Sequence, residues 1–121
     1  MIGLGLDAVE VDRFRRVLAR TPAIAERLFT DGERAYGARF ADPAPRLAAR
    51  FAAKEATMKA LGVGLGAVDF REVEVWSAPS GAPSLRLSGR AAALAGARGV
   101  TSFRLSITHT DSMAEAVVAA L

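Results

Sequence analysis

The pattern of apolar residues changes along the chain, and this change restricts its possible folds more than any other feature. From Asp12 to Gly62 the apolar residues recur at helical spacing, whereas after residue 69 short segments alternate as strands do. Between these regions, residues 62–69 (GVGLGAVD) hold three glycines within five positions and predict a loop. Residues 2–10 also alternate weakly and predict a strand. We therefore predict an α+β fold, with helices packed on an antiparallel sheet.

Local signals set the expected boundaries of the elements. Thr21-Pro22 reads as an N-cap followed by proline at the first helical position, and Thr30 with Glu33 matches a capping box. Residues 41–45 (ADPAP) predict a loop before a helix over 46–61. The remaining segments predict a helix from residue 89 to near residue 96 or 99, and strands at 70–77, 84–88, 102–110 and 113–121.

The composition excludes several classes of protein. A chain of 121 residues is expected to form one domain, residues 1–121, because domains usually contain about 100–200 residues. The absence of cysteine excludes disulfides, a thiolate nucleophile and a cysteine-based metal site. Asp7 interrupts the opening segment too early for a secretory signal, and no apolar run approaches the ~18 residues of a membrane span. We expect a cytoplasmic protein that does not contact a membrane.

Two carboxylates lie in segments that are otherwise apolar. Asp7 lies within GLGLDAV, and Glu55 shares a face of the predicted 46–61 helix with Leu47, Phe51 and Met58. An uncompensated buried charge costs several kcal/mol, so both acids need a partner. Oxygen ligands of this kind suit Mg²⁺. Water molecules and substrate phosphates then complete the coordination of the ion. Zinc is not expected, because there is a single histidine and no cysteine.

Only two of the sixteen lysine and arginine residues are lysines, and they lie on either side of Glu55. Lysine offers a compact charge and a transferable proton, whereas arginine stays protonated. We therefore predict that Lys59 acts as a proton donor or as a point charge on phosphate. Lys54 could do the same or lie on the surface. The alternative for Glu55 is an i, i+4 ion pair with Lys59 on a solvated helix face, which contributes only about 0.2–0.5 kcal/mol.

Positive charge is concentrated in the first half of the chain, where nine arginines occur from Arg13 to Arg50. Such a surface favours an acidic partner, which could be nucleic acid, an acidic protein or a phosphorylated cofactor. The alternative is an ordinary solvated helical surface. The single histidine, His109, ends the predicted strand SFRLSITHT and is either a structural residue or a ligand contact.

Three segments together resemble the holo-acyl-carrier-protein synthases, which are small 4′-phosphopantetheinyl transferases. These segments are GLGLDAVEVDR (3–13), RFAAKEATMKALGVGLG (50–66) and SITHT (106–110), and the resemblance extends over essentially the whole chain. It implies transfer of 4′-phosphopantetheine from coenzyme A to a serine of apo acyl carrier protein, in fatty-acid or polyketide biosynthesis. Adenosine 3′,5′-bisphosphate would be the second product.

The resemblance also implies roles for individual residues. Asp7 and Glu55 would hold Mg²⁺, and Glu55 would take the serine proton directly or through water. Lys59 would contact phosphate and assist the leaving group. Arg13, and Arg20 by a looser match, would contact acidic residues of the carrier protein. The implied coenzyme A contacts are Arg50, Lys59, Gly62, Gly64, Pro83, Ser106, Thr108 and His109.

Small members of this family form homotrimers with active sites between subunits. The resemblance therefore implies a homotrimer, with Val75 or Val117 exposed on the sheet and covered by a neighbouring copy. Two alternatives remain, a basic nucleic-acid-binding module and a catalytically silent trimeric scaffold. Nucleic acid is not the expected partner, because the chain has few aromatic residues and no nucleic-acid-binding motif.

Overall fold

The computed structural model describes residues 1–121 and confirms the predicted α+β fold. In chain order its elements are β1 (Gly3–Glu10), α1 (Val11–Arg20), α2 (Ile24–Leu28), α3 (Asp31–Gly37), α4 (Ala44–Ala60), η1 (Phe70–Glu72), β2 (Val73–Ser77), β3 (Pro83–Leu87), α5 (Gly89–Ala97), β4 (Phe103–His109) and β5 (Met113–Ala120). Every paired strand is antiparallel to its neighbour. None of the helices combines the length and the apolar character needed to cross a membrane.

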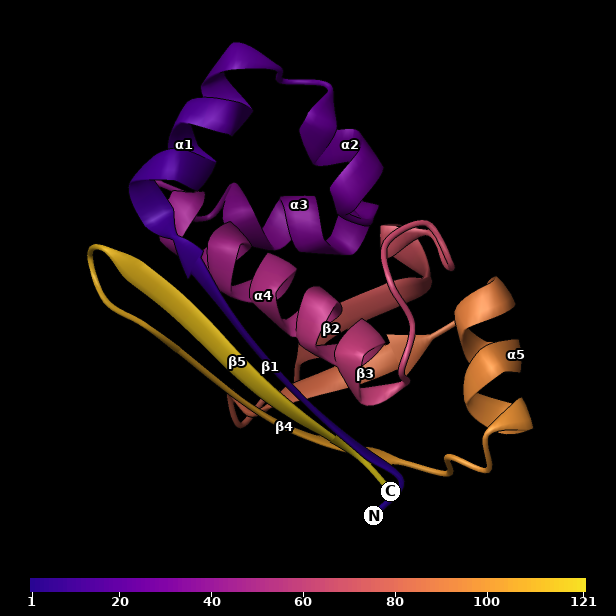
Figure 1. Ribbon diagram of the computed structural model, residues 1–121. Coiled ribbons are helices and arrows are strands. Elements are labelled where there is room, and N and C mark those ends of the chain that lie inside the picture. The colour runs from indigo at the N-terminus through magenta and orange to yellow at the C-terminus, as the bar shows by residue number, and fades with distance from the viewer.

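The main sheet has three strands in the order β1-β5-β4, while β2 and β3 form a separate hairpin. β1 pairs with β5 along its whole length, from Gly3 opposite Ala120 to Glu10 opposite Met113. The first and last strands are therefore neighbours, and the two chain ends lie side by side (Figure 1). The long helix α4 lies across one face of this sheet, with α1, α2 and α3 beyond it (Figure 1).

The central core forms where α4 meets the inner face of the sheet. Alanines on α4 face short or branched side chains on β5, which lets the helix come close to the strands. This cluster contains Ala52, Ala53, Ala56, Ala60, Val75, Ala116, Val118 and Ala120. A second cluster around Phe14 and Phe29 joins α1 and α2 to α4. α4 therefore packs against the three strands of the main sheet and against α1, α3 and β2.

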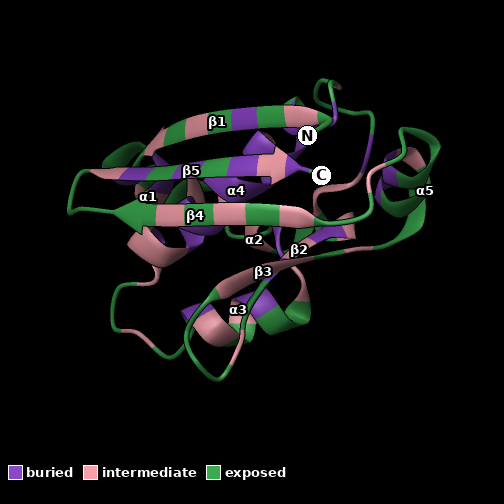
Figure 2. Cartoon of the chain, turned by 90° about the horizontal axis from the view of Figure 1, so that it is seen from below, coloured by how far each residue is buried: buried purple, intermediate pink, exposed green.

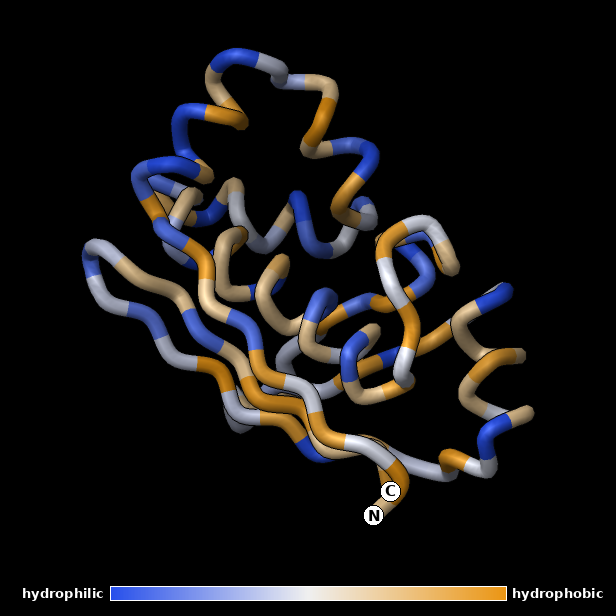
Figure 3. The backbone as a smooth tube through the Cα atoms, viewed as in Figure 1, coloured by the Kyte–Doolittle hydropathy of each residue, from blue (hydrophilic) through white to orange (hydrophobic).

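The outer face of the main sheet is left open. Exposure alternates along its strands, as the period of two requires (Figure 2). Leu4 and Leu6 of β1 are 59% and 65% exposed, and Val117, opposite Leu6, is 38% exposed. Hydrophilic residues recur along α1 and α2, whereas the neighbouring ends of β1 and β5 are mainly apolar (Figure 3). An apolar stripe thus remains uncovered within the chain.

Two predicted helix starts are wrong. Thr21 ends α1 and does not cap α2, which begins only at Ile24. The carbonyl of Thr21 instead accepts a hydrogen bond from Ile24 N at 3.0 Å, so the Thr-Pro pair forms a turn between the helices. α4 begins at Ala44, inside the expected loop, because Pro45 fits the first helical turn, where its missing N–H has no partner to lose.

The capping box is confirmed, since Thr30 and Glu33 exchange the two expected hydrogen bonds at the start of α3. The strand predicted from residue 70 begins only at Val73, because residues 70–72 form a 3₁₀ turn. The prediction that Val75 is exposed is wrong. Val73 and Val75 share the inner face of β2 and are fully buried, while Trp76 faces outward.

Candidate active site

Two glycines allow β1 to carry Asp7 against α4. A Cβ atom on Gly5 would lie 1.8 Å from the carbonyl oxygen of Ala56, and one on Gly3 would lie 1.8 Å from that of Ala60. The strand therefore packs directly on the helix backbone. Asp7 is the next residue on the same face of the strand, so its carboxylate also meets the helix. The spacing of GLGLD, with glycines two and four residues before the acid, is the sequence signal for this close approach.

The structure brings Asp7, Glu55 and Lys59 together. Lys59 Nζ donates hydrogen bonds to Asp7 Oδ1 at 3.1 Å and to the carbonyl oxygen of Leu6 at 2.9 Å. The Asp7 side chain is largely buried, at 13% exposure, whereas that of Lys59 is 55% exposed. Glu55 and Lys59 line a cavity of about 100 Å³ together with Gly64. Lys59 pairs with Asp7, so the simple ion pair between Glu55 and Lys59 does not form.

Negative charge exceeds positive charge in this cluster. Burial raises the pKa of the Glu55 carboxyl, the charge of Asp7 raises it further, and the Lys59 ammonium lowers it. Two carboxylates thus lie near a single ammonium, and an added cation would relieve their repulsion. The oxygen donors fit Mg²⁺, which commonly takes one or two carboxylates and completes its shell with water and phosphate. The structure contains no group of three or more histidine, aspartate or glutamate side chains that could hold a metal ion. Water and phosphate would therefore have to supply the remaining ligands.

The glycine loop begins beside this cluster. Gly62 follows α4 with a positive φ of 74°, and its amide donates to the carbonyl of Lys59 at 3.0 Å. A Cβ atom on Gly62 would lie 3.0 Å from the Arg98 guanidinium, whereas Gly64 has open space around it. Gly64 therefore forms part of the cavity wall beside Glu55 and Lys59, while Gly62 lies at the end of α4.

The other predicted coenzyme A contacts form a separate group. Arg50, Pro83 and His109 line a cavity of about 150 Å³ that also includes Arg46. This cavity and Asp7 lie toward opposite edges of the main sheet, because His109 ends β4, Asp7 is on β1, and β5 separates the two strands. The predicted site residues thus form two groups within one chain.

Two predicted contacts belong to neither group. Ser106 and Thr108 are exposed on β4, at the positions that alternate with the half-buried Leu105 and Ile107. Their side chains therefore lie on the outer face of the sheet, beside the exposed stripe that includes Val117. Nothing within the same chain brings them to either cavity.

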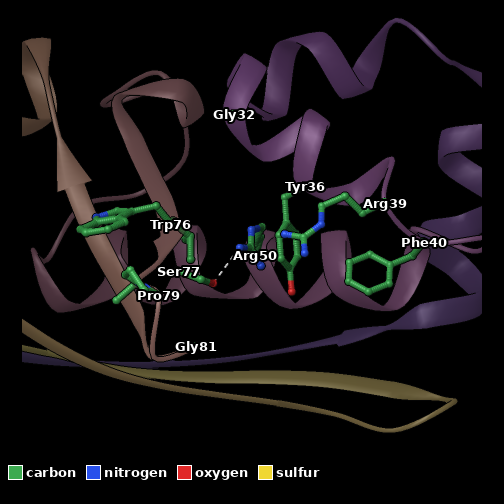
Figure 4. Close-up of a pocket in the computed structure, with 11 residues that line it drawn as sticks. Gly32, Tyr36, Arg39, Phe40, Arg50, Trp76, Ser77, Pro79 and Gly81 are labelled. Atoms are coloured by element: carbon green, nitrogen blue, oxygen red, sulfur yellow. Dashed lines mark hydrogen bonds between the residues drawn. The ribbon is translucent and has the colours of Figure 1, made fainter.

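Arg50 also borders a larger cavity of about 660 Å³, shown in Figure 4. Its guanidinium lies 3.7 Å from the centre of the Tyr36 ring, and it donates to Ser77 Oγ at 3.3 Å. Arg46, which lines the neighbouring cavity of about 150 Å³, stacks on Phe40 at the same distance of 3.7 Å. The two rings are 5.3 Å apart, which makes a continuous wall of stacked cations and aromatic rings. Such a wall suits phosphate groups and a flat base.

Lys54 lies in neither cavity and is not on the surface, so both predictions for it are wrong. Its side chain is fully buried, and Nζ donates to Glu33 Oε1 at 2.7 Å. It also donates to the carbonyl oxygens of Phe70 at 2.9 Å and Val73 at 2.7 Å. The three donors of an ammonium are all satisfied, whereas the flat guanidinium fork of arginine would not match acceptors that converge in this way. The use of lysine in an arginine-rich chain was the available signal.

A third cavity, of about 440 Å³, lies between α1, α2, β1 and α4. It is mainly apolar, with Phe14 and Phe51 in its wall, and it extends to Glu55. Arg13 lines its edge and is exposed to solvent. Arg20 is also exposed but lies at the far end of α1, outside the cavity.

Comparison with known proteins identifies similar sequences and structures. The family described as the 4′-phosphopantetheinyl transferase superfamily matches residues 3–118. Proteins named holo-[acyl-carrier-protein] synthase from Frankia casuarinae and Streptomyces avermitilis are 49% and 46% identical over 120 residues, which is 99% of this chain and 97% of each relative. The crystal structure of holo-[acyl-carrier-protein] synthase from Neisseria meningitidis has a TM-score of 0.91 at 31% identity and covers 100% of this chain and 98% of its own. That from Helicobacter pylori, in complex with coenzyme A, has a TM-score of 0.86 at 29% identity, with coverage of 98% and 99%.

Proposed function

The chain belongs to the 4′-phosphopantetheinyl transferase superfamily, and we propose that it transfers 4′-phosphopantetheine from coenzyme A to a serine of apo acyl carrier protein. The products are holo acyl carrier protein, for fatty-acid synthesis, and adenosine 3′,5′-bisphosphate. One observation carries the proposal. Asp7 is distant in sequence from Glu55 and Lys59, yet the three side chains meet at one edge of the sheet.

Asp7 and Glu55 are the proposed ligands of Mg²⁺. When bound there, the ion would neutralise charge on the coenzyme A pyrophosphate as the phosphorus is attacked. We propose a second role for Glu55 as the general base, because this carboxylate lines both the cavity it shares with Lys59 and the apolar cavity beside Arg13. The serine oxygen forms its bond to phosphorus, its proton passes to Glu55, and the bond to the adenosine bisphosphate oxygen breaks.

Lys59 is the proposed contact to the leaving phosphate. Its side chain is more than half exposed, so the ammonium can turn from Asp7 toward a bound phosphate without a large loss of burial. A fixed positive charge at that position stabilises the negative charge that develops on the departing oxygen. Gly62 and Gly64 place the following loop beside it without side chains that would obstruct the ligand.

The nucleotide part of coenzyme A is proposed to bind in the cavities around Arg50. Arg46, Arg50 and His109 offer hydrogen-bond donors for phosphate, with Pro83 beside them, and Tyr36 offers an aromatic face next to Arg50. Ser106 and Thr108 would contact coenzyme A only from a neighbouring copy, because they lie on the outer face of the sheet.

We propose that the two groups of site residues complete each other between subunits of a homotrimer. Asp7, Glu55 and Lys59 of one copy would then face the Arg50 cavity of the next. Burial of the exposed Leu4, Leu6 and Val117 would favour this assembly, since each Å² of apolar surface removed from water contributes roughly 25 cal/mol. We propose further that residues 1–121 act as one domain and that the protein works in the cytoplasm.

The carrier protein is proposed to approach along α1. Arg13 and Arg20 are exposed on that helix and would attract its acidic surface. The apolar groove beside Arg13 extends to Glu55, so a carrier protein bound there would present its serine to the carboxylate.

Mass spectrometry of apo acyl carrier protein, incubated with coenzyme A, Mg²⁺ and the purified protein, tests the proposal. We expect addition of one phosphopantetheine group per carrier protein, and none when a chelator replaces Mg²⁺. A carrier protein that stays unmodified while a known synthase modifies it in parallel would refute the proposed function.

A further inference from the structure

A buried ion pair connects three elements of the chain. The side chains of Lys54 on α4 and Glu33 on α3 are both 0% exposed. Glu33 Oε1 accepts from Lys54 Nζ and from the amide of Thr30, and Oε2 accepts from the amide of Val75 on β2 at 2.9 Å. Lys54 gives its other two hydrogens to backbone carbonyls at the start of the hairpin segment, those of Phe70 and Val73.

The pair lies next to the large cavity along all three elements. On α3, Tyr36 lies about one turn after the glutamate, and on α4, Arg50 lies about one turn before the lysine. On β2, Ser77 lies two residues after the amide that the pair binds, on the same face of the strand. These three residues form the stacking contact and the hydrogen bond in the cavity wall (Figure 4).

This wall depends on the spacing of elements that are weak by themselves. α3 has only seven residues, and isolated helices shorter than about 12–15 residues are marginal in water. β2 and β3 form a two-stranded hairpin, which is also marginal by itself. The hydrogen bond from Arg50 to Ser77 is already 3.3 Å long, so a small separation of α4 and β2 would break it.

We propose that the Lys54–Glu33 pair is a positioning unit for nucleotide binding, which fixes α3 and β2 on α4 so that Tyr36, Arg50 and Ser77 hold their geometry. The inference rests on the proposed function, since it assigns this cavity to the adenosine bisphosphate part of coenzyme A. An apolar pair of equal volume could fill the same space. It would leave the buried backbone groups of β2 without partners and would not fix the position of the strand.

The single tryptophan, Trp76, lines the cavity and provides a fluorescence signal for binding. The experiment compares the dissociation constant for adenosine 3′,5′-bisphosphate of Lys54→Met with that of Val11→Ala. Val11 is a matched control because it is fully buried in the cluster around Phe14 and lines none of the cavities described above. Both variants are measured at a temperature where circular dichroism shows them folded.

We expect Lys54→Met to bind the nucleotide at least about tenfold more weakly, while Val11→Ala stays within about twofold of the wild type whatever its melting temperature. KM for coenzyme A should rise in Lys54→Met with little change in KM for the carrier protein, since α1 is not attached through the pair. If Lys54→Met does not fold, Glu33→Gln/Lys54→Met replaces it, because that variant leaves no unpaired buried charge.

Wild-type affinity in the folded lysine variant would overturn the inference, as would an equal loss in both variants. Failure of both lysine variants to fold would overturn it too, because the pair would then hold the fold as a whole. A wild-type protein that does not bind adenosine 3′,5′-bisphosphate would instead refute the proposed function, so the two failures are distinct.

Discussion

Replacing Gly5 with alanine tests whether the close packing of β1 on α4 builds the carboxylate cluster. The added Cβ atom would lie 1.8 Å from the carbonyl oxygen of Ala56 and 2.8 Å from its carbon. Ordinary contact begins at about 3.5 Å. Relief of the clash with the carbonyl oxygen, which starts from 1.8 Å, therefore requires the strand and helix to separate by about 1.7 Å. The position of the Cβ atom is fixed by the strand backbone, and the carbonyl belongs to the helix backbone, so no side chain can rotate to avoid the contact.

Overpacking of this kind costs about 1–3 kcal/mol, and the rigidity of both partners favours the upper end of that range. Alanine recovers about 0.4–1 kcal/mol by restricting the unfolded chain. The net loss of about 2 kcal/mol corresponds to a fall in melting temperature of roughly 8 °C for a chain of this length. Asp7 moves with the strand, and because a displacement of 1 Å can cost about 100-fold in rate, we expect a similar loss of transferase activity.

Scanning fluorimetry gives the melting temperature, and mass spectrometry of the carrier protein gives the rate at a temperature where both proteins are folded. Gly96→Ala in α5 is the control, because a Cβ atom there has nothing within 4 Å. It should melt at the wild-type temperature or slightly above and keep full activity. A Gly5→Ala protein that melts within about 2 °C of the wild type and transfers at the wild-type rate would refute the packing argument.

Two further substitutions test charge and capping. In the ion-free protein, Glu55→Gln should melt higher than the wild type at pH 8, because burial and Asp7 raise the pKa of this carboxyl and make its charged form unfavourable. This gain in melting temperature should shrink as pH falls toward about 4.3, the ordinary glutamate pKa. Equal melting temperatures of the variant and the wild type at pH 8 in a chelator would contradict the prediction. Thr30→Ala should lose about 1–2 kcal/mol in urea unfolding, because the hydroxyl caps α3 and binds Glu74. Thr30→Ser should lose less, and an equal loss would show that the hydroxyl is not responsible.

The carboxylates of the candidate site could be predicted because each is an acid in an apolar segment, where an unpaired charge is costly. The same reasoning failed for Lys54, since a lysine on a helix is usually solvated. α4 does not have the expected solvated face along most of its length, because twelve of its seventeen residues are buried. Whether a helix is enclosed depends on distant segments, here β1, β5, α3 and β2, and that information is not local.

The cavity wall around Arg50 shows the same limit. Tyr36 and Phe40 are four residues apart, which indicates a pair of neighbouring aromatic rings, but nothing in the spacing places arginines of another helix against them. The exposure of Val75 was predicted wrongly for a related reason. The side of β2 that faces α4 follows from the 3₁₀ turn and from the amide that Glu33 binds.

β1 is a single strand whose two sides serve different purposes. Gly5 and Asp7 point to the helix, while Leu4 and Leu6 point away from it, so one layer of backbone separates the exposed leucines from the reactive carboxylate. A small molecule that displaces the neighbouring copy proposed to cover the leucines, and that bends the strand, would therefore disturb the carboxylate without entering either cavity. Inhibition of this kind would not be relieved by raising the concentration of coenzyme A, which distinguishes it from occupation of the nucleotide cavity.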